Sequence, residues 1–519
     1  MSEQRYPVGI DLGTTFSAIS YVDDGGRVET VRLADNKLCM ASAVYFADEN
    51  DIIVGSEALD FRVVYPDRVA RRFKRDMGNP DWTFSVGDRK FRPEELSAMV
   101  LRKLINEAQA KIGPIEEVVI SVPFIFDAAR RQATKNAGQI AGVKVLDIID
   151  EPVAGALAYA HKLLQAGKTE AWEMTELFGD RIILVYDLGG GTFDLTLMKV
   201  KPDFTYEVVA TAGDAQLGGE DWDDVLEKII VAKYIETFET NPAADKSLMQ
   251  DLRIKAVDAK FTLTESGRAK VELTRDDQTS EVIVTRAEFQ KQAEALVFRT
   301  EMTLQEMMNS KRMEFSSVES VLAIGGSCRM PMIVTRLEHL TKRSIDMSLS
   351  PDTAVSQGAA LFAAYRKGHG KLKKIHIRTV NPHALGLMVY SRKREKHVND
   401  VLIRSNEPTL TKAKRVYPVA QSAREISLIV LQGDLEDPRD CVKLGMATIP
   451  NVPPELLQGA KVVVAFSFQE NGLLVVEAEV QPSDGQPPVT LQFDVKVEGS
   501  MSEAEVAEAE DILTGITIN

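Results

Sequence analysis

A repeated segment constrains this chain more than any other feature of its sequence. The two copies read VGIDLGTTFSAISYV (8–22) and LVYDLGGGTFDLTLMKV (184–200). In each copy an apolar run ends in Asp-Leu-Gly, a Gly/Thr turn follows, and a second apolar run begins. Self-similar segments far apart in a chain indicate a duplicated unit. We therefore expect a duplicated α/β domain with two facing lobes.

The Gly/Thr turn in each copy is typical of a phosphate-binding site. Glycines let the backbone approach a ligand closely, and successive N–H groups in such a turn form a concave anion site. Walker A and Rossmann loops lead into a helix, whereas each turn here leads into a second strand-like run. The segment AGKTE (166–170) is not a Walker A loop, because Lys162 stands where its first glycine belongs. Two such hairpins, one from each lobe, would clamp a polyphosphate between them.

Carboxylates and hydroxyls flank both turns and are suited to a hydrated metal ion. They belong to Asp11, Asp187 and Asp194 and to Thr14, Thr15 and Thr192. Magnesium takes oxygen ligands and keeps several waters, so we expect the aspartates to bind it through water. The alternative is a pair of ordinary tight turns capped by aspartates. The duplication of the pattern favours the phosphate site.

Apolar periodicity divides the chain into an α/β part and a later β part. Helical spacing predicts helices over 92–113, 151–167, about 220–239, 245–264 and 286–311, and 352–368, and a buried strand over 116–123. The basic, proline-ended segment at 367–382 has the composition of a linker. From 383 to 498 short alternating runs predict strands, and Asn471-Gly472 predicts a hairpin turn. A capping box at Ser502 and Glu505 begins a last short helix.

Charge and cysteine content exclude several classes of protein. A net charge of −15 and a pI near 5.1 argue against a general nucleic-acid binder. Three distant cysteines without a CxxC motif exclude a disulfide framework and argue against a zinc ribbon. The sequence contains no HExxH motif and no apolar run long enough for a membrane span. Its start lacks a signal-peptide apolar region, so we expect a cytoplasmic protein without membrane contact.

Five motifs together resemble the DnaK-type heat-shock chaperones, which belong to the actin-like ATPase superfamily. They read GIDLGTTFS, VISVPFIFDAARRQATKNAGQIAGVKVLDIIDEPVAGALAYA, VYDLGGGTFD, GDAQLGGEDWD and AIGGSCRMPMI. The resemblance runs from about residue 6 to about residue 498. It implies an α/β actin-like ATPase domain of two duplicated ribonuclease-H-like lobes, followed by an all-β sandwich that binds peptides. The implied division is 1–368 for the ATPase, 369–380 for the linker, 381–498 for the sandwich and 499–519 for a truncated lid.

Site residues follow from the resemblance position by position. It implies catalytic roles for Lys74, Glu151, Asp11, Thr192 and Asp194. It implies nucleotide contacts at Gly13, Thr14, Thr15, Gly189, Gly190, Gly191, Thr192, Gly218, Gly219, Glu220, Lys260, Thr264, Gly325, Gly326, Ser327, Arg329 and Asp352. A proline switch at Pro123 and its arginine partner Arg131 would relay the nucleotide state. Without the resemblance, Lys74 would read as part of a solvated basic run.

The β part supplies the implied peptide groove. Its lining would be Leu387, Tyr390, Tyr417, Ala420, Ile426 and Leu428, although Ile426 and Leu428 are equally typical of sandwich core. The implied function is an ATP-dependent chaperone that binds extended apolar segments of unfolded proteins. Its cofactors would be ATP or ADP, Mg²⁺ and, as a further candidate, K⁺, and its partners a J-domain co-chaperone and a nucleotide-exchange factor. The alternatives are a nucleotide-gated binding protein with little turnover and a small-molecule kinase of the same superfamily.

Three departures from the family pattern bear on these expectations. Val257 replaces a glutamate of the nucleoside helix, so we expect weaker nucleotide binding, while Phe261 replaces an arginine that stacks on the base. The linker KLKKIHIRTV is basic where the family linker is acidic and leucine-rich, which leaves linker docking and J-domain stimulation as an open question. The sequence continues only about twenty residues past the sandwich, so we expect rapid peptide exchange.

Overall fold

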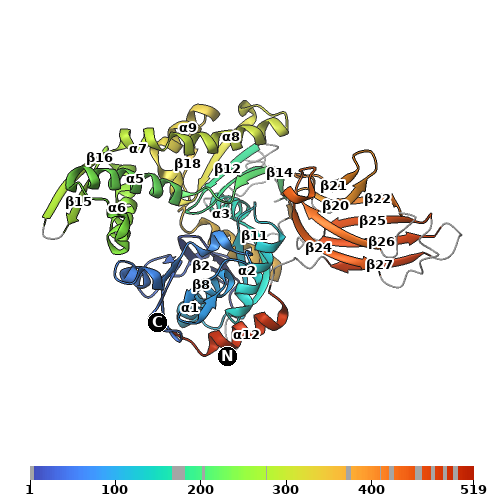
Figure 1. Cartoon of the computed structure of the whole chain (residues 1–519), viewed down its shortest axis with the longest axis horizontal. Helices are drawn as coiled ribbons and strands as arrows, with labels where there is room; N and C mark the ends of the chain where they lie inside the picture. The colour runs from blue at the N-terminus through green and yellow to red at the C-terminus, as the bar shows by residue number, and fades with distance from the viewer. Residues whose placement is uncertain are drawn as a thin grey trace.

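The computed structural model shows two α/β lobes and a β-sandwich (Figure 1). It describes residues 5–165, 182–201, 205–275, 278–369, 376–408, 411–419, 426–449, 459–468, 474–482, 488–494 and 501–519. The central sheet of the first lobe has the order β11-β10-β1-β2-β3, with β4 (Met40–Ala41) also paired to β2. Its strands are β1 (Val8–Asp11), β2 (Phe16–Val22), β3 (Val28–Thr30), β10 (Glu117–Val122) and β11 (Lys144–Asp150).

The central sheet of the second lobe repeats this arrangement. Its order is β18-β17-β12-β13-β14-β19. The strands are β12 (Ile182–Leu188), β13 (Phe193–Val200), β14 (Thr205–Asp214), β17 (Val318–Ile324), β18 (Ile345–Asp346) and β19 (His376–Arg378). In both sheets an antiparallel hairpin, β1-β2 or β12-β13, carries a third antiparallel strand on one side and two parallel strands on the other. The repeat predicted from sequence is therefore a repeat of sheet topology, and it gives the two Gly/Thr turns equivalent places.

Two helices, α3 (Glu151–Gln165) and α10 (Ala354–Lys367), pack against both central sheets. Their apolar side chains form one buried cluster with residues of β10, β12, β13 and β17. The helices cross closely, because a Cβ added to Gly358 would lie 1.8 Å from the carbonyl oxygen of Ala154. Such contact leaves no room for a side chain where the two helices cross, so the two lobes meet at a tightly packed helix pair.

Further elements complete the lobes. In the first lobe they are α1 (Pro93–Ile112), α2 (Ala128–Ile140), β5 (Ala43–Phe46), β6 (Asp51–Val54), β7 (Val69–Arg71), β8 (Phe84–Val86) and β9 (Arg89–Phe91). In the second they are α5 (Gly219–Phe238), α6 (Lys246–Glu265), β15 (Arg268–Arg275), β16 (Gln278–Thr285), α7 (Arg286–Gln292), α8 (Glu294–Ser310) and α9 (Pro331–Thr341). The predicted helices are confirmed with one correction. The helix expected over 286–311 is two helices, because Ala293 leaves helical geometry with φ −90° and ψ 2°.

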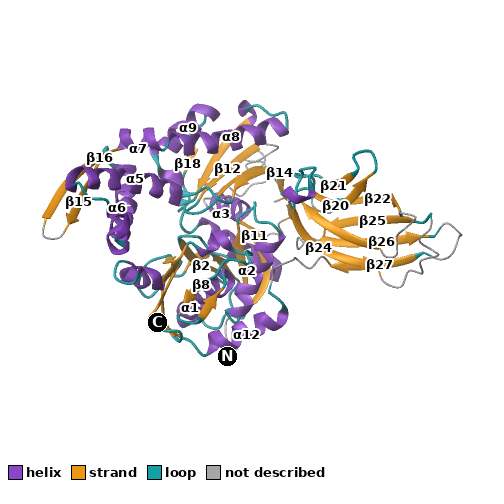
Figure 2. Cartoon of the chain, in the orientation of Figure 1, coloured by secondary structure: helices purple, strands orange, loops and turns teal. Residues whose placement is uncertain are grey.

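The C-terminal β part is a sandwich of two four-stranded antiparallel sheets (Figure 2). One sheet contains β20 (Leu385–Ser391), β21 (Lys396–Ile403), β23 (Ile426–Gln432) and β24 (Val442–Ile449). The other contains β22 (Lys412–Pro418), β25 (Lys461–Phe468), β26 (Leu474–Gln481) and β27 (Val489–Asp494). Strands β25 and β26 pair antiparallel, as the hairpin prediction requires. The turn residues Asn471 and Gly472 lie outside the described residues.

The sandwich contacts both lobes. Strand β19, which belongs to the expected linker, pairs in parallel with β14 and so extends the second central sheet. Asn406 of the sandwich accepts hydrogen bonds from the Thr211 N–H and hydroxyl at 2.9 and 3.0 Å. On the first lobe, Ala128 of α2 packs against the sandwich core. Residues 376–378 of the expected linker therefore pair with the second lobe, and residues 370–375 lie outside the described residues.

The last helix packs on the first lobe. Helix α12 (Glu503–Thr514) begins at the predicted capping box, where Ser502 Oγ accepts a hydrogen bond from the Glu505 N–H. Its apolar face, with Leu513, joins the main core of the first lobe, and β28 (Thr517–Ile518) pairs in parallel with β6. Figure 1 shows this segment beneath α2 and apart from the sandwich. We expected a truncated lid at 499–519; the described part of that segment instead completes the first lobe.

Within the described ranges, no helix is both long and apolar enough to cross a membrane.

Candidate nucleotide site

The two Gly/Thr turns face one another where the lobes meet. A Cβ added to Gly190 would lie 2.0 Å from Thr15 Oγ1, and one added to Gly191 would lie 2.5 Å from Thr14 Oγ1. These glycines therefore permit an approach that any side chain would prevent. The structure brings together the two turns that the sequence repeat predicted as a pair.

Three carboxylates gather beside the turns. Asp187 and Asp194 are direct cross-strand partners on β12 and β13. Asp11 accepts a hydrogen bond from Ser121 Oγ at 2.8 Å, and Asp194 Oδ1 accepts one from the Ile125 N–H at 3.0 Å. Burial, reinforced by the nearby charge of Glu151, raises the pKa of Asp11 to about 7 and that of Asp194 to about 8. The pKa of Asp187 is raised well above its ordinary value for the same reasons.

A buried ion pair stands at the centre of these acids. Lys74 lies on the short 3₁₀ helix Phe73–Asp76, and its Nζ is 2.7 Å from Glu151 Oε1. The two side chains are only 4% and 10% exposed. A buried ammonium is stable only when paired, and here it is the cation placed among four carboxylates. The solvated-run interpretation of Lys74 is therefore wrong.

The N-terminal end of α5 is hydrogen-bonded to the second turn. The N–H groups of Gly219 and Glu220 donate to the carbonyls of Gly189 and Gly190, each at 2.9 Å. A Cβ added to Gly218 would lie 2.5 Å from the carbonyl oxygen of Gly190. The GGED segment thus holds the glycine turn at the N-terminus of a helix, whose dipole favours an anion.

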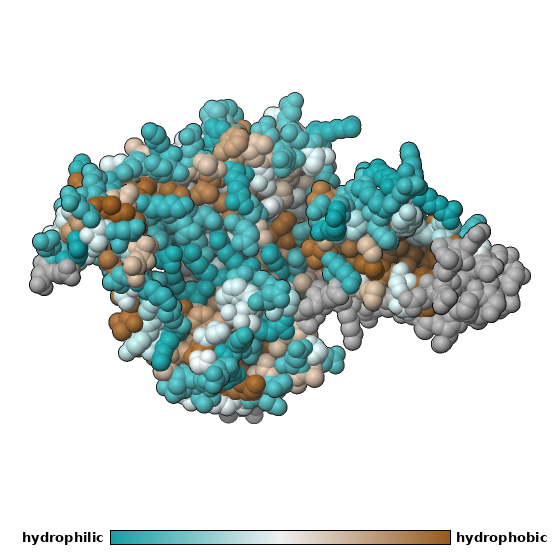
Figure 3. All heavy atoms as spheres, in the orientation of Figure 1, coloured by the Kyte–Doolittle hydropathy of each residue, from teal (hydrophilic) through white to brown (hydrophobic). Residues whose placement is uncertain are grey.

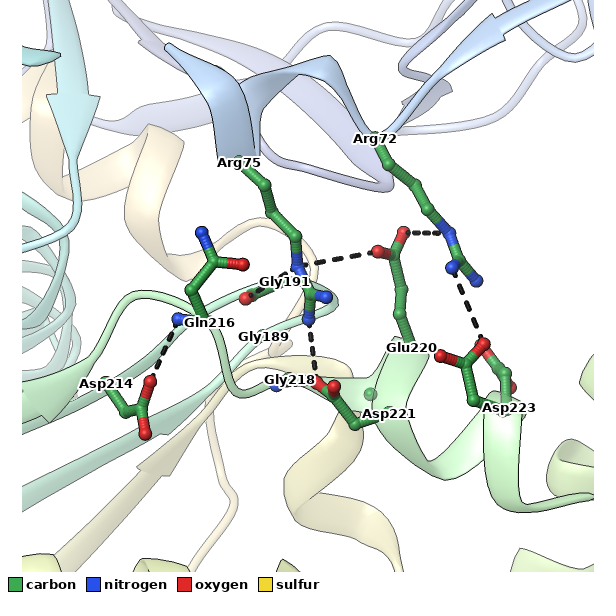
Figure 4. Close-up of polar contacts among 12 residues, drawn as sticks. Arg72, Arg75, Gly189, Gly191, Asp214, Gln216, Gly218, Glu220, Asp221 and Asp223 are labelled. Atoms are coloured by element: carbon green, nitrogen blue, oxygen red, sulfur yellow. Dashed lines mark hydrogen bonds and ion pairs between the residues drawn. The ribbon is translucent and has the colours of Figure 1, made fainter. Parts of the chain in front are cut away.

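Arginines of the first lobe reach across to this helix (Figure 4). Arg72 Nε lies 3.1 Å from Glu220 Oε1, and Arg75 Nη2 lies 2.8 Å from Asp221 Oδ2. Arg75 Nε also donates to the carbonyl of Gly191 at 3.0 Å. These contacts join the lobes across the opening between the turns. Burial raises the pKa of Glu220 to about 7, although both arginines act in the opposite direction.

The residues expected to contact the nucleoside lie in the second lobe. Lys260 Nζ donates to the Gly219 carbonyl at 2.9 Å, and Ser327 Oγ donates to the Gly189 carbonyl at the same distance. The turn at 325–329 begins with Gly325 at φ +80°, a conformation that favours glycine. Ser327 therefore contacts the turn that precedes Thr192, and Lys260 contacts the start of α5 that packs on this turn.

The remaining residues of this end are more open. Arg329 Nη2 lies 3.5 Å from Asp352 Oδ2, and both side chains are about half exposed. Thr264 uses its hydroxyl on the Lys260 carbonyl within α6. Gly326 lies near Asp352, and Phe261 is exposed on α6. The structure therefore places Gly326, Arg329 and Asp352 close together, whereas the hydroxyl of Thr264 bonds within its own helix.

The predicted relay residues lie between the carboxylates and the sandwich. Pro123 directly follows β10, and the loop after it supplies the Ile125 N–H that donates to Asp194. Arg131 on α2 donates to the carbonyls of Phe124 and Phe126 and pairs with Asp150. This places Arg131 as a brace for the loop rather than as a ligand of the nucleotide site.

The predicted peptide residues do not all come together. Leu387 and Leu428 are buried in the sandwich core, and Tyr417 and Ile426 are half-buried against it. Tyr417 donates to Asp400 Oδ2 at 2.8 Å. Tyr390 is 58% exposed, and strand alternation places it on the face opposite Leu387. Ala420 lies outside the described residues.

Comparisons with known proteins give the family. The family model described as Hsp70 protein matches residues 7–84 and 79–513. The chain belongs to the Hsp70 family. The protein named Chaperone protein DnaK from Metamycoplasma hominis is 32% identical over 517 residues, covering 98% of this chain and 82% of the relative. The protein of the same name from Thermotoga petrophila is 32% identical over 490 residues, covering 92% of this chain and 79% of the relative.

Sequence reasoning missed several polar residues of this Hsp70 site. Ser121, Arg72, Arg75 and Asp221 each contact a predicted residue. Arg72 and Arg75 flank Lys74 in RRFKRD, so the basic run could have signalled them. Ser121 offered a weaker signal, as a hydroxyl within an otherwise apolar strand.

The raised acid pKa values make a prediction for this Hsp70 without nucleotide and Mg²⁺. The native state holds protons on Asp11 and Asp194 up to about pH 7 to 8, whereas the unfolded chain releases them near its ordinary values. The folded protein then binds more protons, so the free energy of unfolding should fall as pH rises from about 5 to about 8. Urea unfolding in EDTA at several pH values measures this slope. Asp194→Asn should flatten the slope, whereas Asp67→Asn, at a 75% exposed side chain, should not; equal slopes in all three proteins would contradict the prediction.

Proposed function

We propose that this Hsp70 is an ATP-hydrolysing chaperone that binds extended apolar segments of unfolded proteins, with hydrolysis regulating its affinity for them. The observation that carries the proposal is the buried Lys74–Glu151 pair among Asp11, Asp187 and Asp194 at the meeting point of two glycine turns. Phosphoryl transfer is catalysed mainly by positioning and by charges that offset those of the phosphates. The site holds both acidic and basic groups in fixed places. The sandwich contacts both of the lobes that form this site.

The shared topology of the two central sheets supports duplicated ribonuclease-H-like lobes of the actin-like ATPase superfamily. In that arrangement each hairpin presents its amides to phosphates from one side. The threonines Thr14 and Thr192 are buried at the turns, whereas Thr15 is exposed. Lys74 would stabilise charge on the transferred phosphate, and Glu151 would accept a proton from or orient the attacking water.

A hydrated magnesium ion fits the carboxylates. Asp194 Oδ2 is buried and has no hydrogen-bond partner among the described residues, so a water held by a cation would satisfy it. Across the described ranges, no three acidic, histidine or cysteine side chains are placed to ligate a metal directly. Binding through water by Asp11, Asp187 and Asp194 therefore suits Mg²⁺, which retains several waters. Bound Mg²⁺ would offset phosphate charge, and K⁺ is a further candidate at the same acids.

The sandwich supplies the peptide-binding surface in this proposal. Figure 3 shows hydrophobic residues gathered on the sandwich and at its junction with the lobes, with further hydrophobic residues on the lobes. Exposed apolar side chains of the sandwich include Tyr390, Val416, Leu435, Val442 and Met446. Large exposed apolar patches indicate protein-binding surfaces. A J-domain co-chaperone and a nucleotide-exchange factor would be further partners, and the three free cysteines suit the reducing cytoplasm.

Peptide release tests whether the sandwich responds to nucleotide. We expect the release rate of a fluorescent apolar peptide to differ between ATP and ADP by roughly 5- to 150-fold, the range of typical couplings between sites. Asn406→Ala should reduce this ratio, because the Asn406 side chain also donates to the Thr211 carbonyl and so makes three interdomain hydrogen bonds. Equal rates with ATP and ADP in the unmodified protein would mean that its domains are not coupled.

A nucleotide-gated binding protein with little turnover remains the second candidate. Val257 supports this second candidate, because its partly buried apolar side chain on α6 cannot hydrogen-bond a ribose hydroxyl. Nearby Phe261 is exposed and suited to cover a base instead. The two candidates differ in whether hydrolysis depends on Lys74.

A further inference from the structure

A histidine of the sandwich reaches the loop behind the nucleotide site. His383 lies between β19 and β20, and its Nε2 is 2.8 Å from the carbonyl oxygen of Ile125 in the first lobe. A carbonyl only accepts hydrogen bonds, so Nε2 must carry the proton and donate. Burial lowers the pKa of His383, which keeps the ring neutral and preserves this tautomer at neutral pH.

The same loop residue binds a carboxylate of the site. The Ile125 N–H donates to Asp194 Oδ1 at 3.0 Å. Arg131 binds the carbonyls on both sides of Ile125, at 3.0 and 3.1 Å. Three consecutive carbonyls of the loop are therefore held by side chains, the outer two by the first lobe and the middle one by the sandwich. Of these two side chains, His383 is the one that comes from another domain.

We propose that His383 is a positioning residue for ATP hydrolysis, which fixes the Asp194 carboxylate through the backbone of Ile125. The inference rests on the proposed ATPase function. Asp194 has one oxygen held by Ile125 and the other without a partner among the described residues. Its orientation therefore depends on the loop. Movement of the sandwich away from the first lobe would release Ile125 and alter the site directly.

This path differs from the polar contact that Asn406 of the sandwich makes with the second lobe. Asn406 binds Thr211 on β14 of the second lobe, and none of its described hydrogen bonds involves the loop at 123–127. Loss of Asn406 weakens docking without removing a partner of Ile125. Comparison of the two positions therefore separates positioning of Asp194 from docking in general.

The test measures steady-state ATP hydrolysis by the full chain with Mg²⁺. His383→Leu removes the donor, and we expect kcat to fall roughly tenfold, with KM for ATP little changed, as for a misplaced catalytic group. His383→Gln keeps an N–H donor and should restore most of kcat. Asn406→Ala should keep kcat near that of the unmodified protein. His383→Met provides a second donor-free variant if the leucine protein proves unstable in thermal unfolding.

The outcomes are distinct from those of the proposed function. If the unmodified protein shows no hydrolysis that depends on Lys74, the ATPase proposal fails. If it hydrolyses ATP and the donor-free variants match it in kcat, only the role of His383 is overturned. An equal loss of kcat in His383→Gln and in Asn406→Ala would also overturn it, because general docking would then explain the effect.

Discussion

Replacing Lys74 with alanine should lower kcat for ATP hydrolysis by at least roughly a hundredfold, the usual loss when one preorganised charge is removed from a transition state. Lys74 is the buried cation among Asp11, Glu151, Asp187 and Asp194, and its Nζ is 2.7 Å from Glu151. Its loss leaves Glu151 buried and unpaired, which also costs about 3–5 kcal/mol of stability. Single-turnover hydrolysis with radiolabelled ATP separates the catalytic loss from a loss of binding.

The matched control is Lys103→Ala. Lys103 lies on α1 of the same lobe and pairs with Glu107 at 3.5 Å on a partly exposed surface, so its loss should leave kcat unchanged. Adding Glu151→Gln to Lys74→Ala should recover stability but not hydrolysis, because it removes the unpaired charge without replacing the cation. Equal rates in the unmodified and Lys74→Ala proteins would contradict the enzymatic assignment and favour the nucleotide-gated binding protein.

Replacing Leu513 with aspartate should release the C-terminal segment and destabilise the first lobe by about 3–5 kcal/mol, a range typical of large core losses. Leu513 is 3% exposed and belongs to the core cluster that also contains residues of α1 and α2. Limited proteolysis should then cut within 501–519, and the thermal transition of the first lobe should move to lower temperature. Calorimetry and mass spectrometry of the fragments measure the two effects.

Ile512→Asp is the control for this change. Ile512 is the neighbouring residue on α12 but is 37% exposed, so the same charge there should leave both measurements close to those of the unmodified protein. If Leu513→Asp changed peptide release and left first-lobe stability intact, the segment would act on the sandwich, as expected of a lid.

Local patterns explain what the sequence could predict. The Gly/Thr turns, the capping box at Ser502 and the helix of α1 each depend on residues a few positions apart, and the structure contains all of them. The position of Lys74 was less secure, because a basic run is usually solvated. Lys74 is buried as the ion-pair partner of Glu151, the first residue of α3, and this contact between distant segments has no local sequence signal.

Contacts between distant elements escaped prediction for physical reasons. Arg75 meets Asp221 only because the lobes face each other, and no periodicity encodes that placement. The neighbours of Tyr390 likewise depend on strand pairing, because a strand presents successive side chains to opposite faces. The register of β20 with β21 puts Tyr390 beside His397, and its place in the peptide groove stays a prediction. Pairing of the described linker residues with the second lobe runs through the backbones of β19 and β14, which side-chain composition does not encode.

The two segments that flank the sandwich end on different lobes. Before it, β19 is hydrogen-bonded into the second central sheet, and after it, α12 and β28 are built into the first. The chain therefore attaches the sandwich to the second lobe on its N-terminal side and to the first lobe on its C-terminal side. Six residues, 495–500, separate β27 from the described start of the C-terminal segment, and an extended residue spans at most about 3.6 Å. While both attachments hold, the sandwich is tied through the chain to both lobes at once. The covalent chain itself therefore joins the two lobes through the domain proposed to bind peptides.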